Sequence, residues 1–497
     1  MGSETMRTAQ MKMKALLPIG IMFLLAWNIP LSGQVQPASD QARMNHVTNC
    51  IQPSVIVQND PQPCQTLVAR MAELKIPAVS IAIVHKGALV WAEGFGTRGP
   101  DGKPATKETL FQAGSISKPL AAMAVLHLVQ VGKLSLDTDI NQALTSWHIP
   151  PSTAAPGAKV TVRELLTHTA GTTVHGFPGY AAGSPVPTLT QVLDGTKPAN
   201  TAPIRVEKIP GSGWQYSGGG FTVMQQAMVD VSRKPFPELL ANTVLGPIGM
   251  TRSTYEQPLP SALKGNAATP YNSDGSLVSG GAHTYPEMAA AGLWTTPSDL
   301  AKYIIEVQNS LAGKANHVLS PEMTATMLTP GQNHWGLGVE TGGSGADPYF
   351  THGGVNEGFQ SLFVAYEKNG DGAVVMTNAA GGLELAFLVM QTIALEYGWP
   401  DFQPPRRTQV KVDRSVLERY VGTYMTTPTF GVEFTVEGDQ LYSQGTGQTK
   451  VPVFPESESR FFMKVNDAEI DFHTDDKGNV DYLIQHQGGH DYKAVKK

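Results

Sequence analysis

Apolar residues follow two different periods along the larger part of the chain. Short runs rich in β-branched residues, bounded by turns, predict strands at residues 79–84, 88–92, 359–366 and 373–377. Longer apolar stretches predict helices at residues 119–131, 221–231, 299–305 and 383–397. Because strands lie near both ends of this region and helices lie between them, we expect an α/β (α+β) sandwich. In it, an antiparallel sheet flanked by helices brings the two ends together.

The pattern changes after a proline-rich linker that contains Pro400, Pro404 and Pro405. Beyond it, short alternating strands are separated by Gly-containing turns, which is typical of a small antiparallel β-barrel. We therefore expect five segments: a signal peptide (1–33), an N-terminal arm (34–73), an α/β domain (74–400), a linker (401–413) and an all-β barrel domain (414–497).

The first residues have the composition of a secretory signal. Arg7, Lys12 and Lys14 precede the apolar run 15–27, and the small residues of 30–33 suit a cleavage site near Gly33. A transmembrane anchor is the alternative reading, but the run falls short of the ~20 residues that a membrane span needs. We expect a periplasmic or secreted protein without stable membrane insertion after cleavage.

The chain has two cysteines, Cys50 and Cys64, on either side of a polar segment. In an oxidising compartment this spacing permits a disulfide that closes a short loop. Two free thiols in an N-terminal arm are the alternative. Neither cysteine has metal-ligand spacing, so neither is given a catalytic part.

Charge and composition narrow the function classes. The net charge is −6, apolar residues make up 41% and charged residues 16%, and no dense Lys/Arg block occurs, so nucleic acid is not an expected partner. The sequence has neither an H-E-x-x-H motif nor a Cys/His cluster, so no metal and no other cofactor is implied. It also has no G-x-S-x-G motif, which argues against an esterase of the α/β-hydrolase type.

The candidate nucleophile is Ser115, in the stretch Phe111-Gln-Ala-Gly-Ser-Ile-Ser-Lys118. This stretch leads into the predicted helix 119–131, and residues three apart on a helix share one face. The Lys118 amine is thus placed to take the proton of the Ser115 hydroxyl, which is how a weak nucleophile is activated. A second pair, Ser261-x-x-Lys264, lies between prolines and Gly265, with no apolar helix after it, and we expect a solvated loop there.

Two further motifs follow in order, Tyr216-Ser-Gly218 in a glycine-dense loop and His352-Gly-Gly354 near a predicted strand. This order resembles that of the serine β-lactamase and penicillin-binding protein family. The similarity is greatest to its class C-related branch, which includes D-aminopeptidases, DD-peptidases and esterases. It covers about residues 74–397, and further segments that resemble the family are 165–171, 216–220 and 292–300.

The resemblance implies a β-lactamase-like fold and a set of roles. Ser115 attacks a carbonyl and forms an acyl-enzyme, Lys118 acts as the base, and Tyr216 is the second proton carrier. His352 completes the catalytic set. His168 and His175 are expected to be structural. The resemblance assigns the oxyanion hole and substrate contacts to Ser115, Val355, Gly353, Gly354, Ser217 and Gly218.

This chain departs from the β-lactamase pattern at two positions. His352-Gly-Gly354 stands where most β-lactamases have Lys-Thr-Gly, which weakens the permanent positive charge that holds a substrate carboxylate. Gly218 stands where class C enzymes have an asparagine that holds the substrate's amide side chain. Both changes argue against efficient β-lactam hydrolysis and leave the acyl-transfer groups in place.

The sequence therefore predicts a serine hydrolase that cleaves amide bonds, in a β-lactam or a D-amino-acid peptide, through an acyl-enzyme on Ser115. A carboxylesterase with the same motifs is the first alternative. A penicillin-sensing or inactive binding module is the alternative from another class. The expected partner is a small-molecule or peptide substrate, and no feature indicates an oligomeric state.

Overall fold

The computed structural model describes residues 39–497 except 344, 467 and 488–489. The predicted signal peptide lies outside the described residues. No helix within the described ranges is long and apolar enough to cross a membrane.

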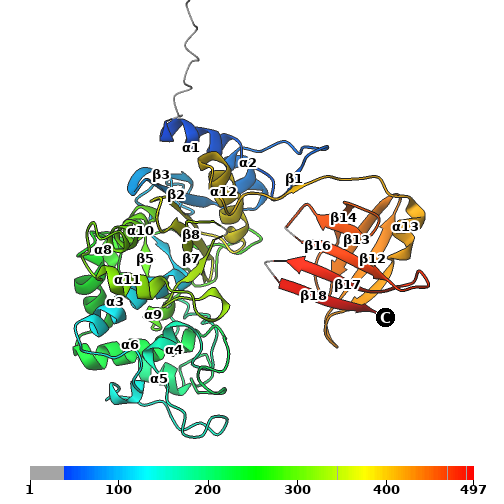
Figure 1. Ribbon diagram of the computed structural model, residues 1–497. Helices are drawn as coiled ribbons and strands as arrows, with labels where there is room; N and C mark the ends of the chain where they lie inside the picture. Colours follow the sequence, from blue (N-terminus) through cyan, green and yellow to red (C-terminus); the bar gives the residue numbers. More distant parts are fainter. Residues whose placement is uncertain (1–38, 344, 467, 488–489) are drawn as a thin grey trace, which may run out of the picture. The chain divides into compact units, whose positions relative to one another are not determined.

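A six-stranded antiparallel sheet forms the centre of the larger domain (Figure 1). Its strand order is β3-β2-β9-β8-β7-β6, so strands from both ends of the domain lie side by side, as the sequence predicts. The strands are β2 (Ala78–His85), β3 (Ala88–Gly96), β6 (Glu340–Gly342), β7 (Tyr349–Asn356), β8 (Phe359–Tyr366) and β9 (Gly372–Thr377).

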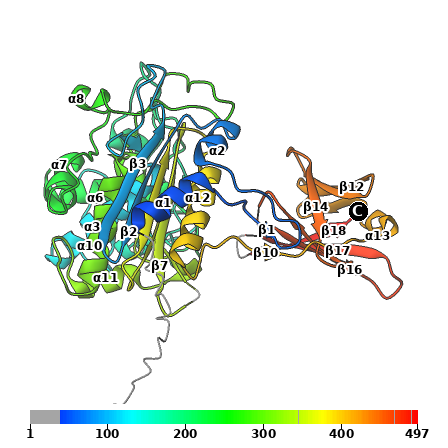
Figure 2. The same cartoon turned by 90° about the horizontal axis from the view of Figure 1, so that it is seen from above.

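Successive side chains of these strands enter two different apolar layers. In β2, Val79, Ile81 and Ile83 pack on one side, while Ala82 and Val84 pack on the other. Helices cover both faces of the sheet (Figure 2), so the side chains on both faces of β2 are buried. The prediction of an antiparallel sheet between helices is confirmed.

One face of the sheet is covered by α1 (Asp40–Asn49), α2 (Leu67–Glu73) and α12 (Gly382–Tyr397). The other face carries the helical region that contains the candidate nucleophile. The helices of that region are α3 (Ser117–Gln130), α4 (Val162–Leu166), α5 (Leu189–Asp194), α6 (Gly218–Ser232), α7 (Phe236–Leu240), α8 (Ser261–Lys264), α9 (Met288–Ala291), α10 (Pro297–Leu311) and α11 (Pro321–Leu328).

Two local predictions are wrong. The pair Ser261 and Lys264 is not in a loop but in the one-turn helix α8, which buries none of its residues. Helix α6 begins at Gly218 rather than at Phe221, because the Ser217 hydroxyl accepts a hydrogen bond from the Gly220 N–H at 3.1 Å and caps the helix. This cap outweighs the poor helix propensity of three consecutive glycines.

The C-terminal strands form a closed eight-stranded antiparallel barrel, as predicted. They are β11 (Gly422–Met425), β12 (Gly431–Glu437), β13 (Gln440–Gly445), β14 (Val451–Pro455), β15 (Arg460–Met463), β16 (Glu469–Thr474), β17 (Val480–Gln487) and β18 (His490–Lys496). Helix α13 (Arg414–Arg419) precedes them. The two-residue strands β1 (Ile56–Val57) and β10 (Arg406–Arg407) pair in parallel, so the N-terminal arm is tied to the linker.

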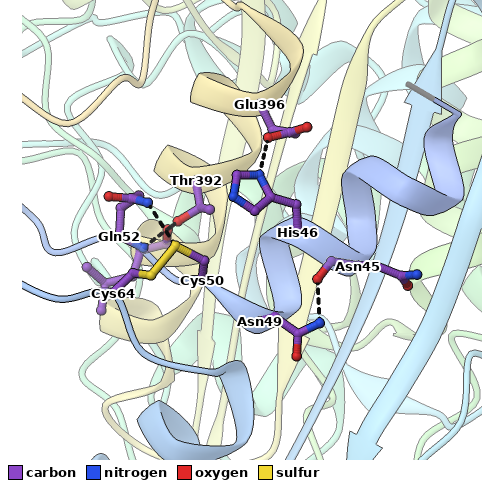
Figure 3. The surroundings of a disulfide bond; sticks show 9 residues. Asn45, His46, Asn49, Cys50, Gln52, Cys64, Thr392 and Glu396 are labelled. Carbon is purple, nitrogen blue, oxygen red and sulfur yellow. Dashed lines mark hydrogen bonds and ion pairs between the residues drawn. A yellow bond between two sulfur atoms is a disulfide. The ribbon is translucent and has the colours of Figure 1, made fainter. Parts of the chain in front are cut away.

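Cys50 and Cys64 form a disulfide at the end of α1 (Figure 3). The same segment is held to α12, because the Gln52 N–H donates to the Thr392 hydroxyl at 3.0 Å and His46 lies 2.6 Å from Glu396. The disulfide therefore closes a loop in the arm that packs against the sheet's covering helix.

Candidate active site

The Ser115 loop is fixed by strand pairing on one side and by a helix on the other. Strand β4 (Phe111–Gln112) pairs with β5 (Trp294–Thr295), and a 3₁₀ turn over Gly114–Ile116 then leads into α3. Ile116 is fully buried, whereas Ser115 is partly exposed. The turn thus anchors its neighbours in the core and leaves the Ser115 hydroxyl accessible.

Lys118 lies one turn further along, beneath Ser115. Its Nζ is 2.9 Å from the Ser115 Oγ and 2.9 Å from the carbonyl oxygen of Ala290. The side chain is 2% exposed, and this burial lowers the pKa of Lys118 to about 7. Near neutral pH a large fraction of the amine is therefore unprotonated.

A neutral Lys118 amine has the geometry of a general base. One of its N–H groups donates to the Ala290 carbonyl, which orients the nitrogen lone pair. The Ser115 hydroxyl can then donate to that lone pair across the same 2.9 Å and transfer its proton as the oxygen attacks. The backbone of α9, far away in the sequence, thus aims the base.

Tyr216 reaches the same point from the loop before α6. Its ring centroid lies 5.0 Å from the Lys118 Nζ, and its phenol shares a hydrogen bond with Ser115. Burial nevertheless raises the pKa of Tyr216 well above its ordinary value, so the phenol stays protonated. A protonated phenol beside Ser115 can donate a proton to a leaving group but cannot serve as the resting base.

His352, on β7, stands 6.4 Å from Tyr216 between ring centroids. Burial, together with the nearby Lys118 charge, lowers the pKa of His352 to about 3, so the imidazole is neutral. Its Nδ1 lies 2.6 Å from the Gly353 carbonyl, which can only accept, so Nδ1 carries the proton. The unprotonated Nε2 is buried and has no partner among the described residues, which makes it an available acceptor.

Strand β7 lies directly against the Ser115 loop. A Cβ on Gly354 would sit 1.9 Å from the Ala113 carbonyl oxygen, and a Cβ on Gly114 would sit 2.5 Å from the Val355 nitrogen. Only glycine permits this approach. It brings the Val355 N–H beside the nucleophile loop, at the position that the resemblance assigns to the oxyanion hole, while the Val355 side chain is 53% exposed.

The structure thus brings together all four predicted catalytic residues, Ser115, Lys118, Tyr216 and His352, with the β7 segment 353–355. Ser217 and Gly218 lie next to them, but their surroundings suit only in part the substrate contacts that the resemblance assigns to them. The Ser217 hydroxyl caps α6 and donates to the Thr173 carbonyl at 2.9 Å. A Cβ on Gly218 would lie 2.8 Å from the Phe177 ring, so Phe177 fills the space that an asparagine would need.

The sequence did not reveal that aromatic rings surround the site. Trp335 contacts His168, Tyr216 and His352 with ring centroids 5.0, 5.7 and 5.5 Å away. The His168 ring packs at a tilt against the Tyr216 ring, with centroids 4.3 Å apart, and its Nδ1 accepts a hydrogen bond from the Ser217 N–H, so His168 holds the Tyr216 loop in place. His168 therefore has the structural part expected of it, whereas Trp335 carried no recognisable sequence signal.

Glu287 was also missed. It stands directly before α9, is fully buried, and neither carboxylate oxygen has a partner among the described residues. Burial raises the pKa of Glu287 to about 8. No cluster of three or more His, Cys, Asp or Glu side chains that could hold a metal occurs in the described ranges, so Glu287 belongs to no such cluster.

A sheet between helices, a partly exposed serine and a buried lysine one turn below are the fold and the residue pair of the β-lactamase family, which is of the serine hydrolase type. The chain belongs to the Beta-lactamase family, whose profile matches residues 65–395. A second profile, a domain of unknown function called DUF3471, matches residues 406–494.

Several known proteins are similar to this chain. A penicillin-binding protein of Bacillus subtilis (strain 168) is 21% identical over 472 residues, which cover 88% of this chain and 99% of that protein. A putative penicillin-binding protein of the same organism is 28% identical over 308 residues, or 59% of this chain and 68% of that protein.

Solved structures show the same fold. The octameric penicillin-binding protein homologue from Pyrococcus abyssi is 24% identical, with a TM-score of 0.57 and coverage of 86% of this chain and 98% of that one. The D-alanine carboxypeptidase AmpC from Burkholderia cenocepacia is 19% identical, with a TM-score of 0.52 and coverage of 65% of this chain and 96% of that one.

Proposed function

We propose that this protein hydrolyses amide bonds, in a D-amino-acid peptide or a β-lactam, through an acyl-enzyme on Ser115. The supporting observation is the contact of the Ser115 hydroxyl with the Lys118 amine, whose burial makes it a base near neutral pH. In this proposal Tyr216 protonates the leaving nitrogen, and the N–H groups of Ser115 and Val355 bind the oxyanion. One such donor is typically worth ~3 kcal/mol of barrier.

Two departures from the β-lactamase pattern, at His352 and Gly218, support our choice of substrate class. A neutral His352 offers an acceptor rather than a positive charge, and Phe177 fills the space above Gly218. Both features disfavour substrates that depend on a carboxylate clamp and an amide-binding asparagine. A D-amino-acid peptide can be bound without either group, so we place D-amino-acid peptides ahead of β-lactams.

A carboxylesterase is the second candidate. It is favoured by the same neutral His352, because an ester leaving group needs no cationic partner at this position. It also needs a weaker proton donor than an amine leaving group does, and the Tyr216 phenol, with its raised pKa, is a weak donor.

Three chromogenic substrates separate these candidates: a D-amino-acid p-nitroanilide, a cephalosporin and a short-chain p-nitrophenyl ester. We expect turnover of the anilide, abolished in Ser115→Ala. The matched control is Ser261→Ala, which removes the serine of the exposed Ser-x-x-Lys pair in α8 and should change nothing. Faster turnover of the ester than of the anilide, relative to their uncatalysed rates, would favour the esterase.

A penicillin-sensing module predicts a different result. Mass spectrometry after exposure to penicillin would then show a lasting adduct on Ser115 without released product. If a fluorophosphonate probe, which labels activated serines, leaves Ser115 unmodified in folded protein, the hydrolase proposal itself is wrong.

We also propose that the protein acts outside the cytoplasm on a small-molecule or peptide substrate. The support is the basic and apolar sequence of residues 7–27 and the two-cysteine arm. Fractionation of cells that express the full chain, with N-terminal sequencing of the mature protein, tests this part.

A further inference from the structure

The interior of the C-terminal barrel is filled at one end only. Side chains on one face of each strand point inward, and at the filled end they are large and apolar. Tyr420, next to α13, stacks on Phe472 with ring centroids 4.0 Å apart, and Phe434 and Phe461 lie 5.1 and 5.6 Å from Phe472. Together with Tyr424 they close this end as a packed core.

Towards the other end the inward positions change character. Along β13 the inward residues run from Leu441 through Ser443 to Gly445, and along β17 they run from Leu483 to Gln485 and Gln487. On both strands a large apolar side chain is followed by small or polar residues. An eight-stranded barrel is just wide enough to be filled by side chains or to hold one small ligand. Here the smaller side chains leave a cavity of about 530 Å³.

The cavity combines apolar walls with uncharged polar groups. Val432, Val451 and Met463 supply apolar surface, while Ser443, Gln485 and Gln487 supply hydroxyl and amide groups. Every lining side chain that the structure describes is uncharged. A charged ligand would therefore lose its hydration without gaining a described ionic partner, which is costly.

The two glutamines present complementary hydrogen-bonding groups. The Gln485 Nε2 donates to the Gln487 Oε1 at 2.8 Å. This contact uses one donor and one acceptor, and it leaves the Gln485 carbonyl as an acceptor and the Gln487 amide nitrogen as a donor. A neutral head group that both donates and accepts, such as a carboxamide, matches this pair.

We propose that the open end of this barrel binds an uncharged amphipathic small molecule, with its apolar body against Val432, Val451 and Met463 and its polar head at Gln485 and Gln487. The cavity volume lies within the range usual for small-molecule sites. The inference does not depend on the proposed hydrolase function, because no residue of the Ser115 site takes part in it.

The test is isothermal titration calorimetry of the full-length Ser115→Ala protein with octanamide, octanoate and octylamine at pH 8. Octanamide should bind at least about tenfold more tightly than either charged analogue of the same chain length. Equal binding of all three, or no binding of octanamide, would overturn the proposal.

Variants then locate the site. Ser443→Phe fills the cavity and should weaken octanamide binding about tenfold or more, and Gln487→Leu, at the open end, should do the same by removing the polar partner. Glu433→Phe is the matched control, because Glu433 is exposed on the outer face of β12, and it should leave binding unchanged. If Ser443→Phe unfolds, Gln487→Leu decides; undiminished binding in that folded variant refutes the site.

Discussion

Lys118 makes the most direct prediction, because its pKa should appear in the pH dependence of Ser115 reactivity. The pKa of Lys118 is lowered from 10.5 to about 7 by burial. The base is the neutral amine, so reactivity should rise with pH and level off above pH 8. Two pH units below the pKa only about 1% of the amine is neutral, so the rate at pH 5 should be ~100-fold below the plateau.

The assay is the second-order rate of Ser115 labelling by a fluorophosphonate between pH 5 and pH 9, which requires no knowledge of the natural substrate. The position of the acid limb identifies the base. A limb near pH 7 indicates Lys118. A flat profile down to pH 5 would point to His352, whose pKa is about 3, and a rate that is still rising tenfold per pH unit at pH 9 would point to the Tyr216 phenolate. Either of the last two results refutes the reasoning.

Two variants complete the experiment. Lys118→Met should slow labelling by ~10²–10⁴-fold, the usual contribution of a general base, and should abolish the limb. The control is Lys264→Met, in the exposed pair of α8, which should leave the profile unchanged. Circular dichroism at pH 5 must show folded protein, so that a loss of rate at low pH reports on the amine and not on unfolding.

The same burial has a cost in stability. Below pH 7 the folded state holds a buried ammonium, and a pKa lowered from 10.5 to about 7 corresponds to roughly 5 kcal/mol. Between pH 7 and 10.5 the unfolded chain binds a proton that the folded chain does not, so the free energy of unfolding rises with pH. Lys118→Met should therefore be more stable than wild type in urea at pH 6, and its advantage should shrink by pH 9.

Three further predictions concern other sites. The pKa of Glu287 is raised from 4.5 to about 8, so between those pH values Glu287 ionises only in the unfolded chain, and the free energy of unfolding falls as pH rises. The stability advantage of Glu287→Gln over wild type in urea should therefore grow between pH 5 and pH 8, and a constant difference would contradict this. The Cys50→Ser/Cys64→Ser double variant opens a loop with a sequence separation of 14 and should lose ~3 kcal/mol of unfolding free energy. Dithiothreitol should cause the same loss in wild type and none in the variant. Gly218→Asn should lower activity on the best substrate at least about tenfold, because its Cβ would meet Phe177 at 2.8 Å, and adding Phe177→Ala should restore it; full activity of the single variant would show that the Phe177 loop yields.

The sequence predicts those parts of the fold whose causes are local. The sheet strands follow from β-branched runs between turns, and the helix α4 begins at a local capping box, in which Thr161 is paired with Glu164 three residues later. The start of α6 was missed because a hydroxyl cap at Ser217 overrode the low helix propensity of the glycines after it. At this point the cap favours a helix and the glycines disfavour one. The Ser217 hydroxyl also donates to the Thr173 carbonyl, a contact between distant residues that the sequence does not reveal.

In the candidate site, too, some features follow from local sequence and others from contacts between distant residues. Ser115 and Lys118 are one helical turn apart, so their spacing places both side chains on one face, and the Ser-x-x-Lys pair of α8 has the same spacing. What distinguishes the reactive pair is burial and a second contact for the amine, and that contact comes from a residue 172 positions away. The Ala290 carbonyl takes one N–H of Lys118, with a sequence separation of 172, and the apolar packing of α3 removes the water that would keep the amine charged. The activity proposed for Ser115 therefore depends on the packed domain, and the Ser-x-x-Lys motif is only the part of the site that the sequence shows.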